Sequence, residues 1–262
     1  MNIKIKKSLG QNFLIDKNII NKIINIGNIE EKDAVLEIGP GTGKLTEYIL
    51  KKKPNKFFVI EKDSNLTKIL KKKFDNQIKI INQDILDFKL ENIKENNLII
   101  FGNLPYNISS QILIKLITYT KKNSTFKKFI LMFQKEVADK ILAKINSKNY
   151  GRLSIISNWK LDIKKELNIS ADCFFPRPKI DSTLLSFEPK KEYFVINNTK
   201  SLEYITRVFF NQRRKMIKKP LKQIFDNPKE IAENFAIDIN LRPQNLSPLI
   251  YFKLAREYEK IK

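Results

Sequence analysis

The chain has 262 residues, of which 50 are Lys or Arg and 28 are Asp or Glu, so its formal net charge is +22. It has no histidine, which excludes Ser-His-Asp and Cys-His catalysis and any His-containing zinc site. The single cysteine, the lack of an apolar run near the roughly 20 residues of a membrane helix, and the lack of a secretory signal lead us to expect a cytoplasmic protein that does not enter a membrane.

Short apolar segments alternate with amphipathic ones through the first 150 residues. Asp16 has the character of an N-cap, and the helix that it begins is expected to end at Gly27. Strands are predicted at 34–38, 57–61, 78–82, 98–101 and 129–133, with helices near 43–53, 63–74, 109–119 and 134–146. This alternation is typical of an α/β fold in which helices cover both faces of a parallel sheet.

The pattern changes after residue 150. The sequence predicts one more helix at 151–160 and then two strands, 162–168 and 182–188, which could add an antiparallel edge to the sheet. From residue 201 onward the sequence is helical and basic. We therefore expect an α/β domain over 1–195, with a basic lead-in at 1–15, and a small all-helical domain over 196–262.

A glycine-rich loop, Glu37-Ile38-Gly39-Pro40-Gly41-Thr42-Gly43, follows the first of these strands and opens a helix. Glycines at such a turn let a ligand approach the backbone. The loop departs from the dinucleotide fingerprint G-x-G-x-x-G at Lys44, and it is one residue too short for the P-loop G-x-x-x-x-G-K-[ST]. It fits without exception the E-x-G-x-G-x-G loop of class I S-adenosylmethionine-dependent methyltransferases.

Two acidic residues stand at the ends of the next strands. Glu61 ends the second strand, where a carboxylate can accept hydrogen bonds from both hydroxyls of a ribose. Asp84 ends the third strand, where it can accept one from the adenine amine. Together with Gly39 and Gly41, these acids predict an S-adenosylmethionine site; the alternative is a tight turn with two unrelated surface acids.

A second motif, Gly102-Asn103-Leu104-Pro105-Tyr106-Asn107, follows the fourth strand and so belongs at the same edge of the sheet. An [N/D]-x-P-[Y/F] tetrapeptide there resembles the amino-methylating site of N6-adenine methyltransferases. The Asn103 side-chain oxygen and the Leu104 carbonyl could each hold one N–H of an exocyclic amine, which is otherwise a poor nucleophile. Pro105 stiffens the turn, and Tyr106 offers a stacking face. A turn with a core tyrosine is the competing interpretation.

The most arginine-rich basic stretch, 207–219, contains no acidic residue. Arg207, Arg214 and Lys218 would share one face of a continuous helix. Guanidinium groups suit phosphate, so we expect RNA binding here, although a solvated helix face also explains a charge run. The candidate RNA-binding residues are Arg207, Arg213, Arg214, Lys215 and Lys218.

Several sequence blocks occur in the order typical of one family. They are GQNFL at 10–14, the EIGPGTG loop, GNLPYNIS at 102–109, QKEV at 134–137, YGRLS at 150–154, FFPRPKIDS at 174–182 and FNQRR at 210–214. Together they resemble the KsgA (RsmA) family of small-subunit ribosomal RNA adenine dimethyltransferases. The resemblance implies a Rossmann-like class I methyltransferase sheet, mostly parallel with an antiparallel edge pair, and a small C-terminal helical domain that binds RNA.

The resemblance also implies a reaction. The family transfers methyl groups from S-adenosylmethionine, leaving S-adenosylhomocysteine and using no metal. Its targets are the N6 amines of two adjacent adenosines in the 3′-terminal hairpin loop of 16S rRNA, in the small ribosomal subunit or its precursor. Nothing in the sequence demands a dimer, so we expect a monomer.

The family's motifs also assign roles to individual residues. Phe174 would face Tyr106 across an adenine flipped out of its stack, whereas Phe175 would belong to the core. The residues that would line the cofactor site are Asn12, Leu14, Gly39, Glu61, Asp84 and Asn103.

Two other functions remain open on the sequence. A 23S rRNA adenine methyltransferase of the antibiotic-resistance type shares both motifs, although GNLPYNIS and FNQRR favour the small-subunit family. A non-catalytic assembly or transcription factor could keep the fold, although the intact Glu37, Glu61, Asp84 and Asn103 argue against lost catalysis. A DNA adenine methyltransferase is disfavoured, because those enzymes usually carry Asp at the head of the tetrapeptide.

Overall fold

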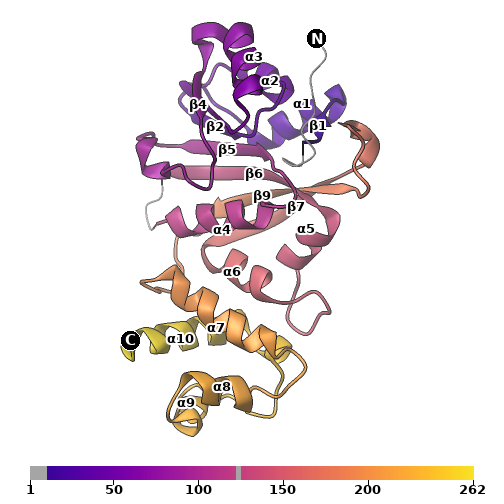
Figure 1. Cartoon of the computed structure of the whole chain (residues 1–262). Helices are drawn as coiled ribbons and strands as arrows, with labels where there is room; N and C mark the ends of the chain where they lie inside the picture. Colours follow the sequence, from indigo (N-terminus) through magenta and orange to yellow (C-terminus); the bar gives the residue numbers. More distant parts are fainter. Residues whose placement is uncertain (1–10, 122–124) are drawn as a thin grey trace. The chain divides into compact units, whose positions relative to one another are not determined.

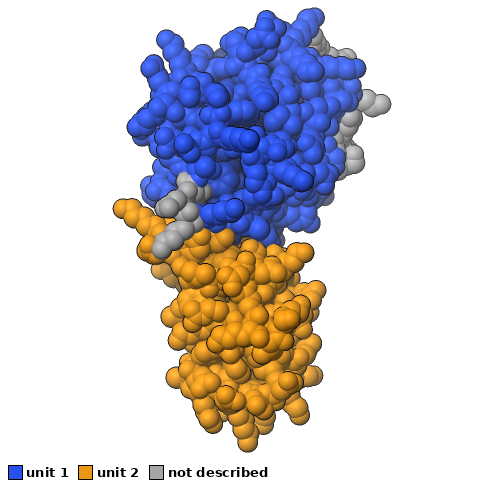
Figure 2. Space-filling view, turned by 90° about the vertical axis from the view of Figure 1, so that its left-hand side faces the viewer, with its two compact units in different colours: residues 1–138, 162–189 blue, residues 139–161, 190–262 orange. Residues whose placement is uncertain are grey.

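The computed structural model describes residues 11–121 and 125–262. The chain forms two compact units, residues 1–138 with 162–189 and residues 139–161 with 190–262 (Figure 2). Of the lead-in expected at 1–15, residues 1–10 lie outside the described part of the chain. Within the described stretches, no helix has the length and apolarity needed to cross a membrane.

A seven-stranded sheet organises the first unit (Figure 1). Its spatial order is β4-β3-β2-β5-β6-β9-β7; β2 to β6 run parallel, and β9 pairs antiparallel with β6. The strands are β2 (Ala34–Ile38), β3 (Lys56–Glu61), β4 (Lys79–Asn82), β5 (Leu98–Asn103), β6 (Phe126–Gln134), β7 (Leu161–Ile169) and β9 (Ser182–Pro189). The predicted parallel strands and the antiparallel addition are confirmed.

The direction in which successive strands are added to the sheet reverses between β2 and β5. β3 and β4 extend from β2 on one side, and β5 and β6 continue on the other. The register sets Ile38 of β2 opposite Ile60 of β3 and Gly102 of β5, so these strands end at one level. An open α/β sheet offers a ligand crevice at the carboxyl ends of its strands where the winding reverses.

Helices cover the strands of the first unit. Figure 1 shows α1 to α3 on one side of the strands and α4 on the other. The helices that lie wholly in the first unit are α1 (Lys17–Gly27), α2 (Lys44–Leu50), α3 (Ser64–Phe74) and α4 (Ser109–Tyr119), and α5 (Lys135–Ile141) runs from the first unit into the second. The first unit also has 3₁₀ turns at Asp75–Gln77, Leu90–Asn92 and Ala171–Cys173. The predicted cap is confirmed, since the Asp16 carboxylate accepts a hydrogen bond from the Ile19 amide at 2.9 Å. The helix expected near 134–146 is shorter and ends at Ile141.

Gly27 is the last residue of α1, as predicted, but the left-handed cap is the next residue. Asn28 has φ 47°, and its N–H bonds to the Asn25 carbonyl at 3.2 Å. Gly27 is required by packing, because a Cβ there would lie 2.3 Å from Cζ of Phe101 in β5. The missing side chain thus lets α1 lie directly on the sheet.

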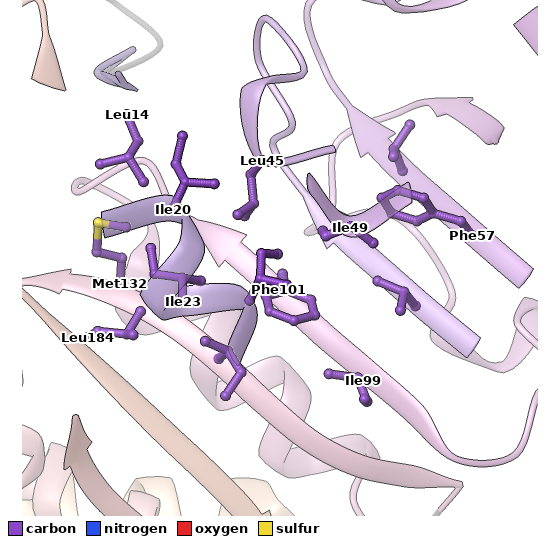
Figure 3. Packing of buried hydrophobic residues seen from close by; sticks show 14 of the residues in the cluster. Leu14, Ile20, Ile23, Leu45, Ile49, Phe57, Ile99, Phe101, Met132 and Leu184 are labelled. Atoms are coloured by element: carbon purple, nitrogen blue, oxygen red, sulfur yellow. The ribbon is translucent and has the colours of Figure 1, made fainter. Parts of the chain in front are cut away.

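The core of the first unit lies between α1 and the central strands. Figure 3 shows Ile20 and Ile23 of α1 beside Phe101, Met132 and Leu184 of β5, β6 and β9. All five side chains are at most 2% exposed. Since burying one such side chain contributes roughly 1.5–3 kcal/mol, this cluster rigidifies the strands that carry the crevice.

A second, two-stranded sheet ties the N-terminal segment to a distant loop. β1 (Phe13–Leu14) pairs antiparallel with β8 (Phe174–Phe175), with Phe13 opposite Phe175 and Leu14 opposite Phe174. The Ile15 amide extends the ladder by donating to the Cys173 carbonyl at 2.8 Å. This pairing holds the segment at 11–14 in place beside the larger sheet.

The second unit is helical. Within it α10 packs on α7 and α6, and the Trp159 indole donates to the Phe194 carbonyl at 2.7 Å, which joins α6 to the connector before α7. Residues 139–161 therefore lie in this unit, whereas the sequence placed them in the first domain. Its elements are α6 (Arg152–Lys160), α7 (Thr199–Asn211), α8 (Lys218–Ile224), α9 (Pro228–Asn234), a 3₁₀ turn at Pro243–Asn245, and α10 (Pro248–Lys260).

Candidate cofactor and amine-binding site

A cavity opens in the first unit at the carboxyl ends of β2, β3 and β5. The segment at 11–14, the glycine loop, the end of β3, the loop after β4 and the turn after β5 all line it. Phe174 is the one predicted cofactor or catalytic residue outside this lining. The cavity brings together the other predicted residues, namely Asn12, Leu14, Gly39, Gly41, Glu61, Asp84, Asn103, Leu104, Pro105 and Tyr106.

The glycine loop adopts a backbone conformation that side chains disfavour. Gly39, Gly41 and Gly43 have φ of 68°, 59° and 76°. Two reasons favour glycine at position 41. Its φ is positive, and a Cβ there would lie 2.8 Å from the ring of Phe13. The loop therefore packs closely against the N-terminal segment on one side of the cavity.

Glu37, at the start of this loop, is a buried acid facing the cavity. It is 2% exposed, and its Oε2 accepts a hydrogen bond from Thr46 Oγ1 at 2.6 Å. Burial raises the pKa of Glu37 to about 8, against the opposing effect of the Thr46 bond. The carboxyl is thus largely neutral at pH 7 and would ionise when a cationic ligand lies beside it.

Glu61 is held in place by the backbone around it. Its Oε1 accepts from the Asp63 amide at 2.8 Å, and its Oε2 accepts from the Gly41 amide at 3.2 Å. Burial raises the pKa of this carboxyl, and the two backbone bonds oppose the rise. Each oxygen of a carboxylate has a second lone pair, so Glu61 can still accept hydrogen bonds from a diol in the cavity.

Asp84 is paired with a lysine that the sequence reading overlooked. Lys62 Nζ lies 2.7 Å from Asp84 Oδ2, and the Leu86 amide donates to Oδ1 at 2.9 Å. Burial acts to raise the pKa of Asp84, but these bonds outweigh it and hold the pKa below its usual range. Asp84 is therefore an ionised acceptor at the rim of the cavity.

The amide of Asn103, the last residue of β5, has a defined orientation. Its Nδ2 donates to the backbone carbonyl of Asn12 at 2.8 Å. Among the residues that the structure describes, none donates to Asn103 Oδ1. The amide thus keeps an acceptor available at the cavity, and its donor is used by the N-terminal segment.

The turn after Asn103 is fixed by local bonds. The Ile108 amide donates to the Pro105 carbonyl at 3.1 Å, and Ser109 Oγ donates to the Tyr106 carbonyl at 3.2 Å. The Tyr106 hydroxyl lies 2.8 Å from Ser182 Oγ, and burial raises the pKa of Tyr106. Tyr106 is partly exposed and lines the cavity, so it is not solely a core residue.

The two adjacent phenylalanines differ in exposure, and Phe175 is not the buried one. Phe174 is 3% exposed and packs in the core with Leu14, whereas Phe175 is 60% exposed. Successive residues of a strand point to opposite faces, so only one of the pair can enter the core. The prediction that Phe175 is core is wrong. The ring of Phe174 is buried in this structure, and its role beside the target adenine stays a prediction.

The basic stretch 207–219 is not one helix. α7 ends at Asn211 and α8 begins at Lys218, so Arg214 lies in the turn between them and the predicted shared face is wrong. Arg213 binds within the second unit, donating to the Lys148 carbonyl at 2.6 Å and to Gln244 Oε1 at 3.1 Å. The other four candidates, Arg207, Arg214, Lys215 and Lys218, are exposed.

Some cavity residues were not assigned a role by sequence reasoning. Phe13 lines the cavity, although its neighbours Asn12 and Leu14 were the ones proposed. Lys62 could have been found, because it directly follows the acid at the end of β3. Lys44, whose sequence position suggested no role, also lines the cavity.

The chain was compared with known proteins. The family model for ribosomal RNA adenine dimethylase matches residues 2–260. A ribosomal RNA small subunit methyltransferase A of Pelagibacter ubique is 58% identical over 262 residues, which is the whole of both chains. A dimethyladenosine transferase from Plasmodium falciparum is 28% identical, with a TM-score of 0.78 over 95% of this chain and 98% of that one.

A further solved structure shares the fold. The 23S rRNA methyltransferase ErmE is 20% identical, with a TM-score of 0.65 over 94% of this chain and 99% of that one. At this identity the likeness shows the architecture of a class I methyltransferase and not the target.

Proposed function

The chain belongs to the ribosomal RNA adenine dimethylase family, and from this premise we propose that it transfers methyl groups from S-adenosylmethionine to the N6 amine of adenosine in ribosomal RNA of the small subunit. The observation that carries the reaction is the Asn103 amide, whose oxygen is left for a substrate amine while its nitrogen is bound by Asn12. This acceptor stands at the same cavity as the acids proposed for the cofactor.

The cavity residues fit the chemistry of S-adenosylmethionine. Glu61 offers acceptors for ribose hydroxyls, Asp84 offers one for the adenine amine, and Glu37 offers a carboxyl that can ionise beside a positive charge. The close contact of Gly41 with Phe13 provides a backbone wall against which a ligand can lie. When bound, the cofactor supplies a methyl group activated by the positive charge of its sulfonium.

Asn103 and Leu104 would orient the target amine. The lone pair of an exocyclic adenine nitrogen is delocalised into the ring, so the nitrogen must be held toward tetrahedral geometry to attack. Asn103 Oδ1 would accept one N–H and the Leu104 carbonyl the other. The lone pair then points into the cavity, and Tyr106, anchored through Ser182, offers its ring to the base.

This reaction does not need a strong base. The nitrogen lone pair would form the new bond to the methyl carbon as the carbon–sulfur bond breaks and its electron pair neutralises the sulfonium, leaving S-adenosylhomocysteine. The amine nitrogen would then carry the positive charge. It then loses a proton to water, which explains how a chain without histidine can act. A monomethylated amine retains one N–H, and one acceptor is enough to hold it for a second transfer.

We place the targets more finely from the motifs. They would be two adjacent adenosines in the 3′-terminal hairpin loop of 16S rRNA, methylated in the small subunit or its precursor in the cytoplasm, by a monomer. The second unit would bind phosphates through exposed basic residues of α7, of the turn that follows it and of the start of α8, namely Arg207, Arg214, Lys215 and Lys218. Arg213 is left out of this set because its guanidinium bridges backbone carbonyls.

The test is methyl transfer from labelled S-adenosylmethionine to four separate substrates. These are undermethylated small subunits, naked 16S rRNA, large-subunit RNA and duplex DNA, with the modified nucleosides identified by mass. We expect dimethyladenosine from the small subunits. Label only in large-subunit RNA would indicate a 23S rRNA methyltransferase instead. Cofactor binding with no label in any of the four substrates would indicate a non-catalytic binding role.

A variant separates cofactor binding from chemistry. Glu61→Ala should weaken S-adenosylmethionine binding first, because the diol acceptor is lost. The exposed Asn18→Ala on α1 serves as a control that should change neither binding nor transfer. Calorimetric binding of S-adenosylhomocysteine, with transfer measured at saturating cofactor, distinguishes the two effects.

A further inference from the structure

In the first unit, large apolar side chains are exposed in a single region of the described chain. Phe175, Ile15 and Ile180 are 60%, 49% and 43% exposed. The remaining exposed large apolar residues belong to the second unit. Ile15 follows β1 and bonds to the residue before β8, and Ile180 lies in the loop that leaves β8, so the small β1–β8 sheet is the centre of this region.

The two faces of this small sheet have different environments. Leu14 and Phe174 are opposite each other and buried in the core. Phe13 and Phe175 form the other cross-strand pair, and directly opposed residues have Cβ atoms about 4.5–5.5 Å apart. Since Phe13 lines the cofactor and amine cavity, Phe175 continues that wall beyond the cavity into solvent.

The charged residues that the structure describes near Phe175 along the chain do not form a phosphate-binding surface. Lys17, Arg177 and Lys179 are exposed nearby along the chain, but they are matched by Asp16, Asp172 and Asp181. Arg177 Nε already lies 3.0 Å from Asp172 Oδ1. A surface that binds the RNA backbone should have a net positive charge, whereas these described residues are balanced in charge along the chain on either side of an aromatic ring.

We infer that Phe175 is a stacking platform for an unpaired base of the substrate RNA, next to the adenosine that enters the cavity. The inference rests on the proposed function. A base that leaves its helix to reach the cavity unstacks its neighbours, and an exposed aromatic ring restores a stacking partner without reading sequence. Ile15, two residues after Phe13 and directly after β1, and Ile180, in the loop after β8, add further exposed apolar side chains to this region.

The kinetic test compares Phe175→Ser with Phe175→Tyr, which keeps an aromatic face. With undermethylated small subunits as substrate, Phe175→Ser should raise KM about tenfold or more, while kcat, cofactor affinity and Tm stay unchanged. Phe175→Tyr should restore the wild-type KM. Val195→Ser removes an equally exposed apolar side chain, 62% exposed, from the second unit and should have no effect.

A second measurement identifies what touches the ring. A photoreactive benzoylphenylalanine at position 175 should form an adduct with RNA of the small subunit, above the level of the same probe at position 195. An adduct only with ribosomal protein, or no excess over position 195, overturns the inference. So does a wild-type KM for Phe175→Ser.

The outcome is separable from the proposed function. If the wild-type chain methylates no ribosomal RNA, the proposed function fails. If it methylates small subunits and Phe175→Ser behaves as wild type, only the stacking platform fails.

Discussion

Asn103 Nδ2 donates a hydrogen bond to the backbone carbonyl oxygen of Asn12, 2.8 Å away and 91 residues earlier in the chain. The bond decides which end of the amide faces the N-terminal segment and which faces the cavity. It also attaches the segment at 11–14 to the turn after β5. One side chain therefore couples the wall of the cofactor cavity to the acceptor proposed for the substrate amine.

Substitutions of Asn103 should separate these two roles. Asn103→Ala removes the acceptor, and we expect methyl transfer to fall roughly 100- to 1000-fold with little loss of cofactor affinity. Asn103→Asp keeps an acceptor but places a carboxylate oxygen against the Asn12 carbonyl, so cofactor affinity should fall more than in Asn103→Ala. Single-turnover transfer and calorimetry measure both. Near-normal turnover of Asn103→Ala would contradict the proposed clamp.

The buried carboxyl of Glu37 should make stability depend on pH. Its folded pKa of about 8 lies above the ordinary value of 4.5, so the folded chain holds a proton that the unfolded chain releases. The free energy of unfolding should therefore fall as pH rises from about 4.5 to about 8, by up to about 1.4 kcal/mol per pH unit. Below and above that window the contribution of Glu37 should be flat.

Glu37→Gln provides the comparison, because it keeps the shape and a partner for Thr46. Tm is measured for both proteins without cofactor from pH 5 to 8.5. As pH rises, the Tm of the wild type should fall relative to that of Glu37→Gln. Taking the difference cancels the effect of the other titrating groups. A difference that does not change across this window would refute a protonated Glu37.

Gly27→Ala should destabilise the first unit. The new methyl would lie 2.3 Å from Phe101 Cζ, and this ring is fully buried in the core. We expect a loss of about 1–3 kcal/mol in the free energy of unfolding. Gly151→Ala is the control, since its nearest heavy atoms are 3.9 Å away and its φ is −176°; it should cost at most about 1 kcal/mol as a helix cap. Denaturant unfolding ranks the two variants, and equal losses would contradict the packing argument.

Two adjacent arginines should behave differently. Arg213→Ala breaks bonds to the Ser147 and Lys148 carbonyls and to Gln244, and should lower Tm by roughly 2–8 °C. Arg214→Ala removes an exposed side chain, so Tm should stay unchanged while the salt dependence of RNA binding decreases by about one counterion. Thermal scans and RNA titrations at several salt concentrations check the pair. Loss of RNA binding in Arg213→Ala without any change in Tm would count against the structural role given to Arg213.

Local sequence was enough to predict the parallel sheet and the residues that line its crevice. Short apolar runs such as 34–38 and 98–101 alternate with amphipathic helical segments, a pattern typical of strands in a parallel sheet that is covered on both faces. Glu61, Asp84 and Asn103 could be placed together because strand ends of a parallel sheet meet at one edge. The extent of the second unit could not be predicted, because whether α6 joins it depends on contacts such as that of Trp159 with Phe194.

The sequence by itself determined the residue types, their order and the edge of the sheet at which they gather, since strand and helix periodicity depend on neighbouring residues. Only the tertiary structure decided which of Phe174 and Phe175 enters the core, because that depends on the register of β8 against β1. It also decided that Lys62 pairs with Asp84 and that the Asn103 amide turns its nitrogen to Asn12. Side-chain orientation depends on contacts with residues distant in sequence, and these contacts cannot be predicted from the local sequence pattern.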